Sequence, residues 1–232
     1  MEPTLHKHGS RNQFASDNYA GICPEAWQAM QEANHGFSNS YGDDIWTEKA
    51  CNALREFFDA ECQVFFVFNG TAANSLAVAQ TTPSYGAVIC HEDSHLNTDE
   101  CGAPEFYSGG AKLLALAGAD CKLDAGVVGE RITSAGHAGD HASKPMLLSL
   151  TQATEFGTVY RPDEIRALSD VVRDKASAPG SRRGGIVCAT SALRMPRSDG
   201  RMTPSSVAIV RIAGIVAWSV AKRYVSVAAS DA

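Results

Sequence analysis

The stretch that decides the fold, residues 64–80, reads V-F-F-V-F-N-G-T-A-A-N-S-L-A-V-A-Q. Its first five residues are β-branched or aromatic and predict a strand over 64–68, and the small residues of 72–80 predict a helix. Asn69, Gly70 and Thr71 form the tight turn between them. The first N–H groups of a helix lack backbone acceptors and favour an anion beside them. We therefore predict a phosphate-binding turn here, with an ordinary strand-to-helix turn as the alternative.

Composition limits the classes of protein to consider. The 232 residues, 44% of them hydrophobic, are enough for one sizeable α/β domain or a large domain plus a fragment. The net charge of −6 argues against nucleic acid as the main partner. No run approaches the roughly 20 apolar residues of a membrane span, and residues 1–10 lack an apolar signal core, so we expect no membrane association. Seven scattered cysteines without a C-x-x-C pair suit reduced thiols, which predicts a cytoplasmic protein.

Apolar periodicity and turn residues divide the rest of the chain into alternating elements. Helices are predicted at 25–34, 45–59 and 162–174, and strands at 86–90 and 145–151, with a further apolar run at 111–116. A helix after Asp124 is weakened by three glycines. The alternation indicates α/β layering with a largely parallel sheet.

Residues 91–95, H-E-D-S-H, match the letters of the zinc motif H-E-x-x-H. In zinc hydrolases both histidines lie one turn apart on a single helix. Here a predicted strand ends at His91, whereas Asp93 and Ser94 favour the start of a helix. We therefore expect the two histidines to lie on different elements. This placement disfavours a zinc hydrolase, and we keep zinc hydrolysis through His91 and His95 only as an alternative. His95 is otherwise placed to stack on an aromatic ligand held by the turn, or is a surface residue at a helix start.

Seven segments, in order and with matching spacing, resemble the low-specificity threonine aldolase family over about residues 14–175. They are S-D-N-Y-A-G-I-C-P-E (16–25), Y-G-D-D (41–44), F-N-G-T-A-A-N (68–74), C-H-E-D-S-H (90–95), D-E-C-G-A-P-E (99–105), G-G-A-K-L (109–113) and T-Q-A-T-E-F-G-T-V-Y (151–160). The resemblance implies pyridoxal 5'-phosphate as cofactor. It also implies the large domain of fold type I, the aspartate-aminotransferase-like fold, which is three-layer α/β/α with a largely parallel mixed sheet, here truncated.

The resemblance implies a lyase and gives its residues roles. The reaction would cleave the Cα–Cβ bond of L-threonine or L-allo-threonine into glycine and acetaldehyde in a homo-oligomer. His95 would stack on the cofactor ring near the substrate hydroxyl, and Glu100 would handle water or a proton there. Ser16 would help bind the substrate carboxylate, and Tyr41 would approach this active site or a neighbouring subunit's. Without the resemblance, the residues alone favour Glu100 as a helix-start charge and Ser16 as a loop hydroxyl. The residues implied at the cofactor phosphate are Asn69, Gly70, Thr71 and Ala72.

The chain departs from the family pattern near residue 176. The family continues with H-x-D-G-A-R, whose Asp pairs with the pyridine nitrogen, and later with a Lys in a G-G-T-K-like turn. Here Asp199 is out of context, and Lys222 is a candidate for the Schiff-base lysine without the glycines, or else a solvated Lys. The charge changes at the same place: residues 1–175 hold 12 Lys and Arg against 24 Asp and Glu, and residues 176–232 hold 8 against 2.

We therefore predict three regions. Residues 1–13 are a lead-in, residues 14–175 form a partial large domain of a pyridoxal-phosphate-dependent enzyme, and residues 176–232 are an atypical basic, poorly ordered tail. A displaced reading frame would explain the tail. The alternative to an active lyase is then a catalytically incomplete fragment that keeps the phosphate-binding turn.

Overall fold

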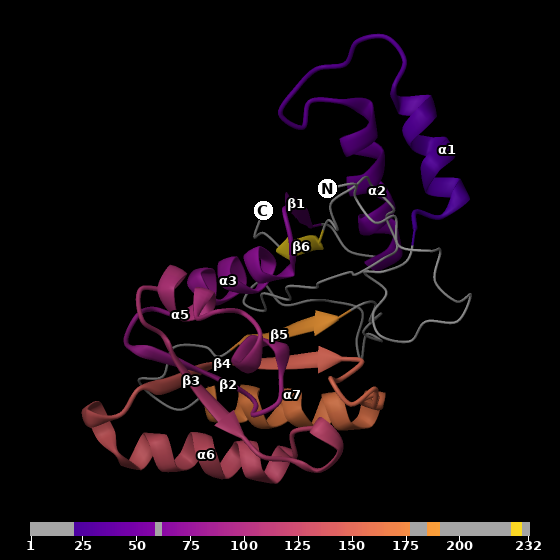
Figure 1. Cartoon of the computed structure of the whole chain (residues 1–232). Helices are drawn as coiled ribbons and strands as arrows, with labels where there is room; N and C mark the ends of the chain where they lie inside the picture. The colour runs from indigo at the N-terminus through magenta and orange to yellow at the C-terminus, as the bar shows by residue number, and fades with distance from the viewer. Residues whose placement is uncertain (1–20, 59–61, 177–184, 191–223, 229–232) are drawn as a thin grey trace, which may run out of the picture.

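The computed structural model describes residues 21–58, 62–176, 185–190 and 224–228. The 1–13 lead-in, Ser16, Lys222 and most of the basic tail lie outside these residues. Within them, helices cover both faces of a central sheet (Figure 1), so the expected three-layer α/β/α arrangement is confirmed.

The central sheet has four parallel strands in the order β3-β2-β4-β5. The predicted strands at 86–90 and 145–151 are confirmed within one residue at each end, because short, mainly apolar runs fit the doubly covered strands of a parallel sheet. The ligand-bearing ends of such a sheet are its carboxyl ends. The bounds are β2 Gly86–His91, β3 Lys112–Leu116, β4 Lys144–Gln152 and β5 Gly185–Thr190.

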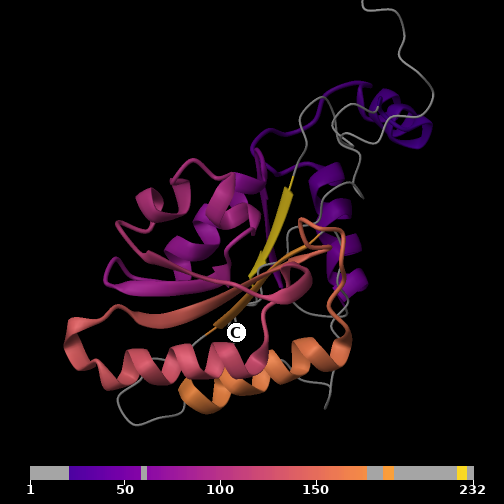
Figure 2. The ribbon, with the colours of Figure 1, turned by 60° about the horizontal axis from the view of Figure 1, so that its bottom comes forward.

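Each face of the sheet carries its own apolar core. Successive residues of β2 point to opposite faces, so Ala87 and Ile89 join one core and Val88 and Cys90 the other. The first core packs under α6 (Ala125–His137) and α7 (Pro162–Ala176), and the second under α3 (Gly70–Thr81). Figure 2 shows the paired helices α6 and α7 below the sheet, and α3 with α5 (Ala103–Tyr107) above it. Because α3 is fixed on the sheet, its N-terminus is fixed as well.

Helix α6 forms although glycines weaken its sequence. The Asp124 side chain caps it by accepting hydrogen bonds from the N–H groups of Gly126 (2.8 Å) and Val127 (3.2 Å). Val128 and Ala135 are buried against the sheet side of the molecule. Capping and burial outweigh the low propensity, as is usual for amphipathic helices in proteins.

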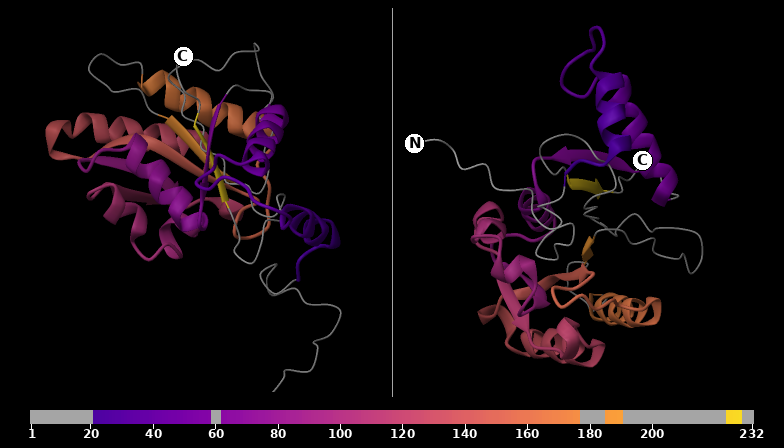
Figure 3. Two further views of the ribbon diagram at one scale, coloured as in Figure 1. Left: turned by 90° about the horizontal axis from the view of Figure 1, so that it is seen from above. Right: turned by 45° about the vertical axis from the view of Figure 1, so that its right-hand side comes forward.

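The segment before the central sheet extends away from it. Strand β1 (Gln63–Val67) pairs antiparallel with β6 (Tyr224–Ala228) in a separate two-stranded sheet rather than in one mixed sheet. Helices α1 (Pro24–Ala33) and α2 (Ile45–Phe58) form an arm that projects from the body in Figures 1 and 3. Within the described residues, no helix combines the length and apolar character that a membrane crossing requires.

Gly118, just before the short 3-10 helix η2 (Ala119–Cys121), is a position where a side chain does not fit. A Cβ there would collide with the backbone carbonyl of Lys122, whose carbon would be 2.9 Å away. We expect Gly118→Ala to lower the free energy of unfolding by about 1–3 kcal/mol or more, measured by urea denaturation. Gly136→Ala is the control. It lies in α6 with no atom within 4 Å of the added Cβ, and we expect it to stabilise by about 0.5–1 kcal/mol. Equal effects of the two substitutions would contradict this account of Gly118.

Candidate active site

The predicted phosphate-binding turn is the N-terminus of a capped helix. The Asn69 side chain accepts a hydrogen bond from the Ala72 N–H (2.9 Å), and its backbone carbonyl accepts one from the Ala73 N–H (3.2 Å). This cap starts α3 at Gly70, two residues before the start predicted from the small-residue run. The N–H groups of Gly70 and Thr71 have no acceptor among the described residues. The turn therefore offers two N–H donors at the positive end of a 12-residue helix.

A buried carboxylate, that of Glu100, contacts α3 at Asn74, one helical turn after Gly70. Asn74, 5% exposed, donates from Nδ2 to Oε1 of Glu100 at 2.6 Å. His95 Nδ1 lies 2.8 Å from the same oxygen, and Glu100 is 2% exposed. Glu100 stands between α4 (His95–Thr98) and α5 (Ala103–Tyr107), and α5 packs on α3, which brings the carboxylate to Asn74. Two distant segments thus meet in one hydrogen-bonded group, Asn74–Glu100–His95.

Glu100 is ionised in this setting. Burial by itself raises the pKa of its carboxyl group, but the hydrogen bonds of His95 and Asn74 and the neighbouring Thr71 hydroxyl outweigh it, so the net pKa is lowered. The second oxygen, Oε2, is buried and has no hydrogen-bond partner among the described residues. A buried acceptor without a donor is costly, so this oxygen is suited to a donor that arrives with a ligand.

The carboxylate also fixes the tautomer of His95. An ionised carboxylate only accepts hydrogen bonds, so the proton of the neutral imidazole is on Nδ1 and the lone pair is on Nε2. The His95 side chain is partly exposed, with 32% of its surface accessible. Glu100 therefore orients the ring and makes Nε2 its basic nitrogen.

The segment T-Q-A-T-E-F-G-T-V-Y forms a closed loop beside His95. Gln152 donates from Nε2 to the Tyr160 carbonyl (3.0 Å) and accepts from the Tyr160 N–H (2.7 Å). The loop brings Glu155 to the first turn of α4, where its Oε1 accepts a hydrogen bond from the His95 N–H at 3.1 Å. Glu155 therefore holds the backbone of His95 while Glu100 holds its ring.

The H-E-x-x-H letters do not form a zinc-hydrolase helix. His91 ends β2 and His95 begins α4, so the two histidines lie on different elements, as expected from the sequence. His91 Nε2 is 3.0 Å from the Gly118 carbonyl, whereas His95 pairs with Glu100. The arrangement that a zinc hydrolase needs, two histidines one turn apart on one helix, is absent from this stretch.

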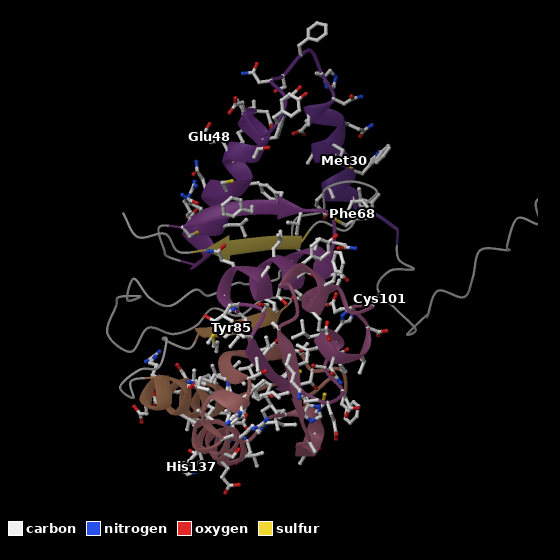
Figure 4. The ribbon with its side chains drawn as sticks, turned by 90° about the vertical axis from the view of Figure 1, so that its left-hand side faces the viewer. Met30, Glu48, Phe68, Tyr85, Cys101 and His137 are labelled. Atoms are coloured by element: carbon white, nitrogen blue, oxygen red, sulfur yellow. The ribbon has the colours of Figure 1, made fainter. Side chains whose placement is uncertain are left out.

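The structure does not bring every predicted site residue together. Tyr41 lies in the loop between α1 and α2 with its side chain fully exposed. That loop is at the end of the arm away from the sheet (Figure 1). Ser16 and Lys222 lie outside the described residues. Phe68, which precedes the turn, and Cys101, which follows Glu100, are labelled in Figure 4.

Two site residues were missed in the sequence. Asn74 is the one large polar residue in the run of small residues that begins α3, and it follows Gly70 by one helical turn, a spacing that places both toward one side. That spacing was a usable signal. Glu155 gave none, because its position depends on how the Gln152–Tyr160 loop closes.

The fold is shared with solved enzymes of fold type I, the aspartate-aminotransferase-like class. The chain superposes on a threonine aldolase from Leishmania major with a TM-score of 0.73 at 20% identity, covering 90% of this chain and 60% of that one. It superposes on a putative histidinol-phosphate aminotransferase from Erwinia carotovora atroseptica with a TM-score of 0.61 at 14% identity, covering 90% and 58%. An aspartate aminotransferase from Rhodobacter sphaeroides gives 0.59 at 14% identity, covering 90% and 54%. At these identities the likeness shows the fold alone.

A family model described as beta-eliminating lyase matches residues 13–177, and the chain belongs to this family. The chain is 52% identical over 162 residues to a low specificity L-threonine aldolase of Pseudomonas sp. (strain NCIMB 10558). It is 54% identical over 162 residues to the protein of the same name from Pseudomonas aeruginosa. Each alignment covers 70% of this chain and 46% of the relative, so the chain spans about half the length of the curated relatives it matches.

The lowered pKa of Glu100 predicts how stability depends on pH. A carboxyl group whose pKa is lower in the folded chain stabilises the fold above its unfolded pKa, about 4.3 for Glu, and this contribution is lost as the pH falls through the folded value. We expect the free energy of unfolding of the unmodified chain to fall more steeply below about pH 5 than that of Glu100→Gln. Gln keeps the shape and an acceptor oxygen but does not titrate. Parallel curves from urea denaturation at each pH would show that Glu100 is not held ionised.

Proposed function

We propose that the chain binds pyridoxal 5'-phosphate and descends from threonine aldolase-type lyases, which cleave L-threonine or L-allo-threonine to glycine and acetaldehyde. The observation that carries the proposal is the Asn74–Glu100–His95 group, with Asn74 and Glu100 buried, next to the Gly70 and Thr71 N–H groups that have no acceptor among the described residues. Membership of the beta-eliminating lyase family and the threonine aldolase relatives support the same chemistry.

The described residues fit two parts of the cofactor, its phosphate and its ring. For the phosphate there are the N–H groups of Gly70 and Thr71 and the Thr71 hydroxyl, with Asn69 and Ala72 completing the turn. For the ring there is the His95 imidazole, and Glu100 Oε2 is a buried acceptor to which no group in the described part of the chain donates. The lysine of the Schiff base is proposed only as Lys222, which lies outside the described residues.

The chain's own residues would then divide the work as follows. The α3 N-terminus holds the phosphate, and His95 Nε2 accepts the proton of the substrate β-hydroxyl. Glu100 keeps the His95 proton on Nδ1 and stabilises the imidazolium that results, and Asn74 holds Glu100. When bound, the cofactor withdraws electrons from the amino acid whose Cα–Cβ bond is broken. Ser16 for the substrate carboxylate and Tyr41 remain part of the proposal.

The second candidate is a catalytically incomplete member of the family, because the sequence departs from the family pattern near residue 176 and no Asp or Lys stands in the expected family motif after that point. We keep the division into a 1–13 lead-in, a partial domain over 14–175 and a basic tail over 176–232 as part of this proposal.

One experiment separates the two candidates. The chain is mixed with pyridoxal phosphate, reduced with borohydride and mapped by mass spectrometry, and a parallel sample is given L-threonine and assayed for glycine and acetaldehyde. A cofactor fixed on one lysine together with product formation supports the lyase. Cofactor binding without fixation or product supports the incomplete fragment. If cofactor does not bind at all, both candidates are wrong.

We further propose a homo-oligomer in the cytoplasm. The arm exposes large apolar side chains with no cover within the described residues, namely Ile22, Trp27, Phe37, Tyr41 and Ile45. Patches of this kind mark association surfaces, and a second copy of the chain is the partner that the family suggests. None of the six cysteines whose placement is described forms a disulfide, as in reducing compartments. Sedimentation of the chain with Trp27→Ser and Phe37→Ser tests the surface: a lower mass than that of the unmodified chain is expected.

A further inference from the structure

Three metal-binding side chains meet at the carboxyl end of β2, on residues that the proposed lyase does not use. They are His91 at the end of the strand, Asp93 two residues later, and Cys121 at the end of η2. One ligand atom from each lies within 4.8 Å of the others. His91 and Cys121 are buried, and the Asp93 side chain is 48% exposed. The cluster is thus built from two segments and open to solvent on one side.

The His91 ring is already oriented as in many metal sites. Its Nε2 lies 3.0 Å from the Gly118 carbonyl, an acceptor, so this nitrogen carries the proton and Nδ1 carries the lone pair. Ligand histidines commonly donate their second N–H to a backbone carbonyl, which fixes the tautomer. Nδ1 faces Cys121 Sγ at 3.5 Å and Asp93 Oδ2 at 3.8 Å. The lone pair therefore points into the cluster.

The spacing fits a small tetrahedral ion. Zinc bonds of about 2.0–2.3 Å to nitrogen, oxygen and sulfur place neighbouring ligand atoms of a tetrahedron roughly 3.3–3.8 Å apart. The nitrogen–sulfur and nitrogen–oxygen distances fall in this range. A ligand set of one imidazole, one thiol and one carboxylate suits zinc, whereas magnesium and calcium prefer oxygen ligands alone.

The backbone holds Cys121 in a left-handed conformation. Asp120 and Cys121 both have φ of 57°, in the left-handed region that non-glycine residues seldom adopt. Such conformations concentrate at functional sites. Two successive left-handed residues place the thiol beside His91 rather than in the apolar cores, where the buried Cys90 lies.

We propose that His91 Nδ1, Cys121 Sγ and Asp93 Oδ2 bind one zinc ion, with a fourth position open to water. Binding replaces the hydrogen bond that the Asp93 N–H makes to Nδ1 at 3.1 Å. The Cys121 thiol releases its proton to solvent and binds as the thiolate. The ion ties the turn after β2 to the η2 turn before α6, and His95 is not a ligand.

The test uses the full chain, freed of metal with a chelator and titrated with Zn²⁺, Co²⁺ or Mg²⁺. We expect one Zn²⁺ per chain, a thiolate-to-cobalt charge-transfer band with Co²⁺, and no binding of Mg²⁺. Cys121→Ser should weaken zinc binding by about 100-fold or more, beyond the usual effect of losing an outer-shell partner, and should abolish the cobalt band. Asp93→Asn should weaken zinc binding and leave the cobalt band in place, and because this side chain is half-exposed the variant should keep the fold.

Two controls decide whether the binding is local. Cys23→Ser removes an exposed cysteine on the arm, and His95→Asn removes the second histidine of H-E-x-x-H. Both should leave zinc affinity unchanged. The proposal is overturned if zinc does not bind, if Cys121→Ser binds as tightly as the unmodified chain, or if His95→Asn is the variant that loses binding. Circular dichroism of each variant separates loss of the site from loss of the fold.

Discussion

Asn74→Asp is expected to lower the free energy of unfolding by about 3–5 kcal/mol at neutral pH, because it places a second carboxylate against a buried one. Asn74 and Glu100 are both nearly inaccessible, and the amide nitrogen that now donates at 2.6 Å would become an oxygen. Two carboxylates at this distance cannot both be ionised without a large cost, so the pair takes up a proton and its pKa rises. Protons then bind more strongly to the folded chain, and stability rises as the pH falls, opposite in sign to the unmodified chain.

Urea denaturation near pH 7 and near pH 5 measures this effect, and a second substitution provides the control. Adding Glu100→Gln to Asn74→Asp exchanges the donor and the acceptor. The new amide at position 100 then donates to the new carboxylate at position 74 of α3. This double variant should recover most of the lost stability. Asn74→Ala removes the donor without adding charge and should cost about 1–3 kcal/mol. If Asn74→Asp costs less than about 1 kcal/mol, or if the double variant is no better than the single one, the buried group is not what stabilises this region.

Gly70→Asp is expected to reduce the affinity for pyridoxal phosphate by about 100-fold or more, which corresponds to about 2.7 kcal/mol. Gly70 is the first residue of α3 and is buried, so a substitution there adds a side chain next to the N–H groups proposed to hold the phosphate. The added carboxylate also repels the phosphate, by about 4 kcal/mol for two unit charges 4 Å apart at an effective dielectric constant of 20. Absorbance titration with pyridoxal phosphate gives the affinity.

Leu76→Asp is the matched control for Gly70→Asp. It adds the same charge to the same helix, at an exposed position in its second turn. We expect the affinity of this variant to stay within about threefold of that of the unmodified chain, since exposed charges a Debye length apart are largely screened. Similar losses in both variants would indicate a general effect of charge, and no loss in Gly70→Asp would remove the turn from the cofactor site.

The elements around the site were predictable because each has a strong local pattern. The β-branched and aromatic run before Asn69 predicts β1 without long-range information. The start of α3 was predicted two residues late, because Asn69 was assigned to the turn and its capping side chain was not recognised. The glycines of α6 were a misleading signal, since burial of Val128 and Ala135 decides that helix. The separate pairing of β1 with β6 was not predictable, because strand partners far apart in sequence leave no local mark.

The candidate site was predictable in part for a similar reason. Residue types near the turn and the resemblance together selected His95 and Glu100, and the structure places them in contact. Their roles in catalysis stay predictions, as do those of Ser16, Tyr41 and Lys222. Glu155 was missed because its contact with the His95 N–H depends on the closed loop between Gln152 and Tyr160. The cluster at Cys121 was missed because two left-handed residues bring the thiol to His91.

The central claim is that backbone N–H groups at the start of α3 bind the phosphate of the cofactor. Titrating the ¹⁵N-labelled chain with pyridoxal phosphate, and separately with pyridoxal, tests it by NMR. The account predicts that the amide signals of Gly70, Thr71 and Ala72 shift strongly with pyridoxal phosphate and hardly at all with pyridoxal. Unchanged signals for these three residues while others respond to the cofactor would contradict it.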